Sequence, residues 1–239
     1  MSGFETTRWS LVLKAGDDSP AARRALDSLC QRYRSPVLAY LRRRGIDGGD
    51  AEDLTQAFFE KIIAQRLYER ADPQRGRFRT FLLSALENFV NDEHQWATRL
   101  KRGGGTKAQS LTETELAADV VATDPDTPES DFDRQWALAV LDGAIDRLAM
   151  QCEAHGKGEI FRKLKSYVIE PAEHDSYQQL AGELGSRPNT IAAAVLRLRT
   201  SLRRHIRAEL ADTVHSNADV DAELVALREA LAFAGASRA

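Results

Sequence analysis

Cysteine and histidine are scarce in this chain, and their positions exclude the kinds of site that depend on them. Of 239 residues only two are cysteine, Cys30 and Cys152, which lie far apart in apolar, helix-like surroundings. We therefore expect neither a disulfide framework nor a cysteine-rich metal site, and we expect both thiols to lie in the core. The five histidines form no HExxH pair and have no cysteine neighbour at metal-ligand spacing. The sequence thus predicts no metal, no cofactor, no catalytic residue and no enzymatic activity.

Long apolar runs and alternating β-branched runs are also missing. The longest apolar stretches are as short as residues 191–196, and the N-terminus lacks a basic region followed by an apolar core. We therefore expect a cytoplasmic protein with no membrane partner. Because Leu, Ala and Arg dominate and no long stretch alternates as a strand does, the sequence predicts an all-α fold.

The net charge of −3 conceals an uneven distribution along the chain. Residues 1–103 carry 18 Lys and Arg against 14 Asp and Glu, and residues 134–210 carry 12 against nine. Between them, residues 104–133 carry one base and eight acids, and residues 211–239 carry two bases and five acids. A basic block alone is ordinary for a solvated helical surface. Two of them around an acidic segment favour a polyanion as partner.

Helical spacing of apolar residues predicts the elements of the chain. Residues 103–131 are rich in glycine and acids and predict a linker with little packed structure. A bend is expected near Pro36. The last helix can dock on either domain or on a partner. The helices are expected over residues 9–15, 21–44, 48–67, 78–102, 132–150, 158–168, 176–206 (as two helices and a turn) and 219–233.

The most informative stretch is Gly48–Ile63, where an acid-rich helix start runs into paired aromatics. One face of this helix carries acidic and amide groups beside Phe59 and Ile63. A cap by Asp50 and the helix dipole explain acids in the first turn, but they do not explain exposed apolar residues beside them. The pattern favours a docking surface for a basic and apolar partner. Four apolar residues share the side that faces the core: Ala51, Leu54, Phe58 and Ile62.

Residues 176–206 have the spacing of a helix-turn-helix. Gly185 is expected at the tight turn, where a positive φ favours glycine, and Pro188 is expected in the first turn of the second helix. The alternative is an ordinary helical hairpin with a glycine turn. Four apolar residues would pack the two helices together: Leu180, Ala181, Ile191 and Val195.

Taken together, these segments resemble the extracytoplasmic-function sigma factors of bacterial RNA polymerase. Residues 32–45 and 50–59 are similar to the helix pair that contacts core polymerase, including the acidic motif Asp50-Ala51-Glu52-Asp53. Residues 78–92 resemble the helix that meets the minus-ten element of the promoter. Residues 176–207 resemble the helix-turn-helix that reads the minus-thirty-five element.

The resemblance implies a transcription initiation factor with two helical domains joined by a flexible acidic linker. The expected divisions are a region 2-like domain over 1–102, the linker over 103–131, a region 4-like domain over 132–210 and a C-terminal extension over 211–239. Its partners would be core RNA polymerase and promoter DNA.

The resemblance also assigns roles to individual residues. Polymerase would be bound by Asp50, Glu52, Asp53, Gln56 and Phe59. The minus-ten DNA, melted to a single strand, would be bound by Arg75, Arg77, Arg79, Asn88, Asn91, Asp92 and Gln95. The minus-thirty-five DNA would be bound by Arg187, Asn189, Thr190, Arg197, Arg199, Arg203 and Arg204.

The chain departs from the family pattern at two points. Residues 192–194 are alanines where many members carry Lys, Ser or Arg, and alanine cannot donate to a base edge. Phosphate and shape contacts are therefore expected to dominate there. The sequence has no cysteine and histidine pattern of a zinc site and therefore no sign of a redox switch. Regulation of the protein must come from another source, and an anti-sigma factor and a Ser/Thr protein kinase are both left open.

Thr55 is the candidate site for such a kinase. It lies between the apolar stripe and Phe59, and phosphorylation would add about 1.5 to 2 negative charges to the docking face. The plainer interpretation is a half-buried threonine without a regulatory role.

Two rival functions remain open at this point. A helix-turn-helix transcription regulator would bind duplex promoter DNA without being a polymerase subunit. A helical adaptor would bind neither DNA nor polymerase.

Overall fold

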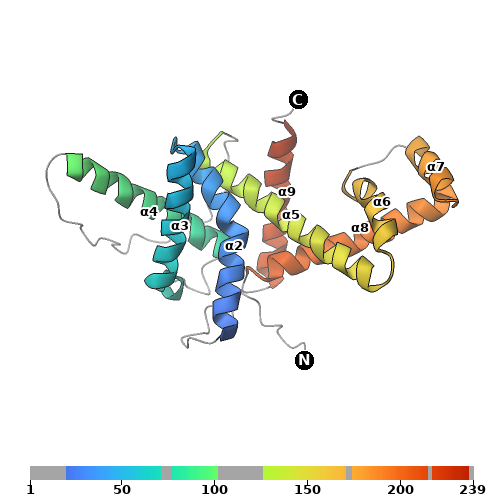
Figure 1. Ribbon diagram of the computed structural model, residues 1–239, viewed down its shortest axis with the longest axis horizontal. Coiled ribbons are helices and arrows are strands. Elements are labelled where there is room, and N and C mark those ends of the chain that lie inside the picture. The colour runs from blue at the N-terminus through green and yellow to red at the C-terminus, as the bar shows by residue number, and fades with distance from the viewer. Residues whose placement is uncertain (1–19, 71–76, 102–125, 171–173, 215–216, 237–239) are drawn as a thin grey trace. The chain divides into compact units, whose positions relative to one another are not determined.

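The computed structural model describes residues 20–70, 77–101, 126–170, 174–214 and 217–236, and the statements below concern these residues. They form α-helices, one 3-10 helix and no strand, so the predicted all-α fold is confirmed for this part of the chain (Figure 1). The predicted helix over 9–15 and the linker up to residue 125 lie outside it. The helices are α2 (Pro20–Arg43), α3 (Gly48–Ala64), η1 (Leu67–Arg70), α4 (Phe78–Lys101), α5 (Pro128–Ala154), α6 (Gly158–Ile169), α7 (His174–Glu183), α8 (Pro188–Ala211) and α9 (Asn217–Ala236).

The chain forms two compact units. The first comprises residues Met1–Ala139 and Ala211–Ala239, and the second comprises Val140–Leu210. These units group residues by packing alone, so the functional division at 1–102, 103–131, 132–210 and 211–239 stays a prediction. The first unit combines segments from both ends of the sequence, which local periodicity does not reveal.

Aromatic side chains from three helices build the core of the first unit. Tyr33 of α2 is wholly buried and meets the edge of Phe78 of α4, with ring centroids 4.9 Å apart. It also packs against Phe132 of α5 at 6.3 Å. Trp136, one turn further along α5, is 1% exposed. Each such aromatic removes a large apolar area from water, and this burial is the main stabilising contribution to the unit.

Two apolar clusters form the core of the second unit. One joins α5, α6 and α8 through residues that include Leu148, Phe161 and Leu202. The other packs the two helices of the helix-turn-helix together, and it contains all four residues predicted for that role: Leu180, Ala181, Ile191 and Val195. Ala181 is 2% exposed, as expected for a small side chain at a close approach of two helices.

Glycines in the left-handed conformation end α2 and α7 in the same way. Gly45 has φ +81° and Gly185 has φ +58°. After each, a backbone N–H reaches five residues back, from Ile46 to the Leu41 carbonyl at 3.2 Å and from Ser186 to the Ala181 carbonyl at 2.8 Å. This is the Schellman arrangement, which satisfies carbonyls at a helix end. The predicted glycine turn of the helix-turn-helix is thereby confirmed, with Pro188 as the first residue of α8.

We expect Gly185→Ala to destabilise the second unit by about 1–2 kcal/mol. A Cβ at Gly185 meets no atom within 4 Å, so the cost comes from the positive φ alone. Gly182 offers a matched control, because a Cβ there is equally unhindered and the residue lies inside α7. Gly182→Ala should stabilise by about 0.5–1 kcal/mol. Urea denaturation measures both, and equal shifts in the midpoint would contradict the prediction.

Candidate functional site

The acidic face of α3 is open to solvent. Asp50, Asp53 and Gln56 are exposed, and neither aspartate forms an ion pair within the described residues. The prediction that Asp50 caps the helix is wrong, because α3 begins at Gly48 and the cap position belongs to Asp47, which makes no side-chain cap hydrogen bond. Asp50 instead lies in the first turn, where it favours the positive end of the helix dipole. Its carboxylate therefore remains available to a partner.

Glu52 differs from the two aspartates because α2 supplies partners for it. Its carboxylate pairs with Arg34 and, at 3.4 Å, with Arg42. All three side chains are well exposed, so this network contributes little stability. It does reduce the negative charge that Glu52 presents, and the unpaired charge of the face thus rests on Asp50 and Asp53.

The apolar residues beside this face divide into one buried and one exposed. Ile63 is 43% exposed, as predicted. The prediction that Phe59 presents apolar surface is wrong: the side chain is 9% exposed, and its ring centroid lies 5.3 Å from that of Phe58. Phe58 in turn packs on Phe89 of α4 at 5.5 Å. Phe59 is therefore part of the buried side of α3.

Thr55 is buried more deeply than its position at the border of the apolar stripe suggests. It is 1% exposed, and its hydroxyl donates a hydrogen bond to the Ala51 carbonyl at 2.7 Å. Ala51 and Phe58, which lie one helical turn before and after Thr55 in α3, are also buried. A kinase would need α3 to open locally before it could reach this hydroxyl.

The residues predicted for minus-ten DNA fall into two groups along α4. Asn91 and Gln95 are exposed, and Asn88 and Asp92 are half-buried. Asp92 forms an ion pair with Lys61 of α3 at 3.2 Å, so it also fastens α3 to α4. Arg75 lies outside the described residues.

Arg77 and Arg79 of this set form ion pairs with carboxylates. Both donate to the same oxygen of Glu223 in α9, from Arg77 Nη1 at 3.1 Å and from Arg79 Nη2 at 3.2 Å. Arg79 is 6% exposed, also pairs with Asp133 of α5, and stacks on Trp136 with its guanidinium carbon 4.6 Å from the ring centroid. Burial raises the pKa of Asp133, and the nearby Arg79 opposes that rise. With α9 packed as it is here, Arg79 lies in the interior and is not exposed to solvent.

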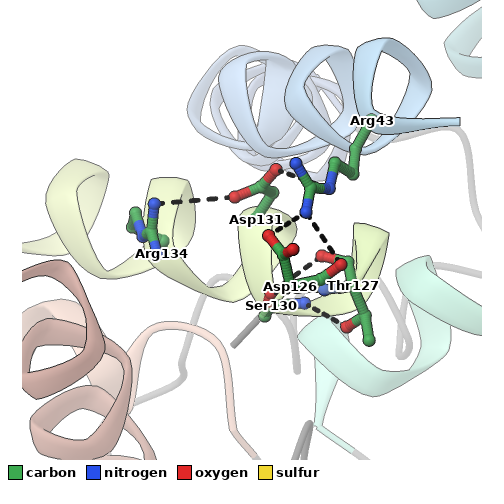
Figure 2. Close-up of polar contacts among 6 residues, drawn as sticks. All are labelled: Arg43, Asp126, Thr127, Ser130, Asp131 and Arg134. Carbon is green, nitrogen blue, oxygen red and sulfur yellow. Dashed lines mark hydrogen bonds and ion pairs between the residues drawn. The ribbon is translucent and has the colours of Figure 1, made fainter. Parts of the chain in front are cut away.

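A cluster around the start of α5 went unpredicted. Thr127 and Ser130 form a reciprocal cap, in which the N–H of each donates to the hydroxyl of the other at 3.1 Å (Figure 2). Arg43, in the last turn of α2, reaches across to the carboxylates of Asp126 and Asp131. The sequence signal for this helix start was Pro128 after a threonine, and it explains why α5 begins four residues before the predicted 132. The cluster fixes the end of the predicted linker to α2.

The residues predicted for minus-thirty-five DNA are mostly exposed around the start and along one side of α8. Arg199 is different, because its guanidinium donates to the carbonyls of Tyr167 and Glu170 at 2.7 and 2.9 Å. These carbonyls end α6, so Arg199 satisfies a helix terminus within the unit. Ala192 is exposed, and Leu196 is 63% exposed. The exposed members of the predicted set are Arg187, Asn189, Thr190, Arg197, Arg203 and Arg204.

The two cysteines are free in the structure. Cys152 is buried as predicted, whereas Cys30 is only partly buried. Burial, and secondarily the charge of Asp27, raise the pKa of Cys30 to about 12, so its thiol is protonated at neutral pH and a poor nucleophile. Among the described residues no group of His, Cys, Asp and Glu side chains is arranged to hold a metal ion. No described helix has the length and apolar character needed to cross a membrane.

A comparison with known protein families matches the part of the chain that contains α3 and most of α2 and α4. Residues 29–99 match the family model described as Sigma-70 region 2. The matched segment includes the acidic face of α3, and the helix-turn-helix lies outside it. No curated protein and no solved structure matches the chain. The match covers 71 of the 239 residues of the chain.

Proposed function

We propose that the chain is a transcription initiation factor of the extracytoplasmic-function type, which binds core RNA polymerase and directs it to specific promoters. The observation that carries this proposal is the match of residues 29–99 to sigma-70 region 2, on helices that present an unpaired acidic face. This function would use both the acidic face of α3 and the helix-turn-helix.

Polymerase would dock on the exposed face of α3. Asp50 and Asp53 supply negative charge that steers a basic partner, and Gln56 supplies hydrogen bonds. Ile63, exposed at 43%, offers apolar surface close by. Phe59 would act indirectly, by holding α3 in place.

Promoter DNA would bind both units. Asn88, Asn91 and Gln95 of α4 supply amide groups that can hydrogen-bond the edges of single-stranded bases. In the helix-turn-helix, exposed arginines of α8 would hold phosphates, and Asn189 and Thr190 near its start would approach the bases. Ala192 offers only a methyl group, suited to a thymine methyl.

A second proposal is that phosphorylation of Thr55 regulates polymerase binding. Because the Thr55 hydroxyl is buried, a kinase could reach it only after α3 opens locally. A phosphate or a glutamate at this position would place charge in the core of the domain, so Thr55→Glu is a poor mimic of a surface phosphate. Mass spectrometry of the chain recovered from cells is the direct test. An anti-sigma factor remains the other proposed regulator.

A pull-down with core RNA polymerase followed by run-off transcription tests the main proposal. We expect the chain to bind the core enzyme and to confer promoter-specific transcripts that core polymerase alone does not make. Promoter binding by the isolated chain, with no retention on polymerase and no transcripts, would instead favour a helix-turn-helix regulator. If the chain binds neither core polymerase nor promoter DNA, a helical adaptor would be favoured.

A further inference from the structure

The C-terminal helix α9 packs into the first unit along one stripe. Val220, Glu223, Leu227 and Ala230 recur at helical spacing, and they are 3%, 0%, 4% and 8% exposed. The segment before it is fastened as well, because the N–H of Phe78 donates to the Thr213 carbonyl at 3.1 Å. Three members of the stripe are apolar, as expected of a helix that faces a core. The fourth, Glu223, is a wholly buried carboxylate and needs an explanation.

The partners of Glu223 are the arginines predicted to hold nucleic-acid phosphates. Arg77 and Arg79 both donate to its Oε1 atom, at 3.1 and 3.2 Å. A carboxylate and a phosphate present the same chemistry to a guanidinium, namely anionic oxygens that accept charged hydrogen bonds. Glu223 therefore uses guanidinium N–H groups that could otherwise bind a phosphate. The segment that carries it is acidic, with five Asp and Glu against two Arg over residues 211–239.

The contact also contains a defect. Oε2 of Glu223 is buried and has no hydrogen-bond partner among the described residues. A buried carboxylate oxygen without a partner retains its desolvation cost, so docking α9 is less favourable than the number of its buried residues suggests. An anion that binds the arginines from solvent would relieve this cost, because Glu223 would then return to water.

We propose that α9 is an autoinhibitory latch: Glu223 withholds Arg77 and Arg79 from nucleic-acid phosphates, and α9 undocks when a single DNA strand takes them. The inference rests on the proposed function, which assigns these arginines to DNA. It explains why two residues expected on a DNA-binding surface lie against a carboxylate of the same chain. It also gives the C-terminal extension a role in setting DNA affinity.

Fluorescence anisotropy with a labelled single-stranded oligonucleotide tests the latch in the full chain without polymerase. Glu223→Gln keeps the shape of the side chain and removes the charge that holds the arginines, so we expect binding about tenfold tighter than that of the unmodified chain. Glu229→Gln is the matched control, because it removes the same charge from an exposed position of α9, and it should change binding by less than about twofold. Equal affinities for the two variants, or no binding by any of the three proteins, would overturn the latch.

Hydrogen exchange gives a second measurement that needs no variant. Addition of the oligonucleotide to the unmodified chain should speed amide exchange across residues 217–236, since the helix leaves its docked position. Unchanged or slower exchange there, at saturating oligonucleotide, would overturn the proposal even if Glu223→Gln failed to fold.

The outcome is separable from that of the proposed function. If the chain binds core polymerase but Glu223→Gln gains no DNA affinity, the latch fails and the proposed function stands. If the variant gains affinity and no protein binds polymerase, the latch is supported as a switch for polyanion binding and the proposed function fails.

Discussion

Asp53→Arg is expected to lower the affinity of the chain for core RNA polymerase by about 100-fold, with the fold left intact. Asp53 is exposed in the second turn of α3 and has no ion pair within the described residues, so its replacement breaks no ion pair among them. Against a basic partner, the new arginine would place like charges together, which costs several kcal/mol at a protein interface. Pull-down and competition binding at about 0.1 M salt measure the loss.

Asp27→Arg is the matched control for charge. Asp27 is exposed on α2, and its reversal changes the net charge of the chain by the same amount. We expect it to bind polymerase nearly as the unmodified chain does. Raising the salt concentration should reduce the difference in polymerase affinity between Asp53→Arg and Asp27→Arg, because screening weakens the interactions of exposed charges. Equal affinities for both variants at low salt would show that α3 is not the docking helix.

Phe59→Ala is expected to destabilise the first unit by about 3 kcal/mol, whereas Ile63→Ala should cost less than about 1 kcal/mol. The reason is burial: Phe59 is 9% exposed and packs on Phe58, and Ile63 is 43% exposed. Urea denaturation followed by circular dichroism measures both losses.

The two variants should rank in the opposite order for polymerase binding than for stability. At temperatures where both variants are folded, Ile63→Ala should weaken polymerase binding more than Phe59→Ala does, because only Ile63 lies at the surface. If instead Phe59→Ala unfolds no more easily than Ile63→Ala, the assignment of Phe59 to the core is wrong.

Local patterns predicted those parts of the fold that depend on local interactions. The positive φ of Gly185 followed from its place between two apolar helices, and the packing of Leu180 against Ile191 followed from their spacing. Such features are decided by backbone geometry and side-chain period over a few residues. The exposure of Asp50 and Asp53 was likewise predicted, since a charged residue with no local partner lies at the surface.

The parts that depend on distant partners could not be predicted. Nothing near Arg79 indicates that Glu223, 144 residues further on, would bury it. A basic residue near a proposed DNA surface looks the same whether its partner is a phosphate, a carboxylate or, as for Arg199, a pair of helix-end carbonyls. The burial of Phe59 and Thr55 was underestimated for a smaller reason. Both lie at the edge of the helical stripe, where the neighbouring helix decides which side chains are covered.

The composition of the first unit also has a consequence for synthesis. Its core takes in residues from Ala211 onward, whereas the second unit is one continuous segment, Val140–Leu210. During translation the second unit is therefore complete before the first. At about 5–20 residues per second, Glu223 is synthesised on the order of ten seconds after Arg77 and Arg79. Until then these arginines lack the carboxylate that later covers them. The nascent chain thus passes through an interval in which these two arginines are open to any polyanion, including the ribosome's own RNA.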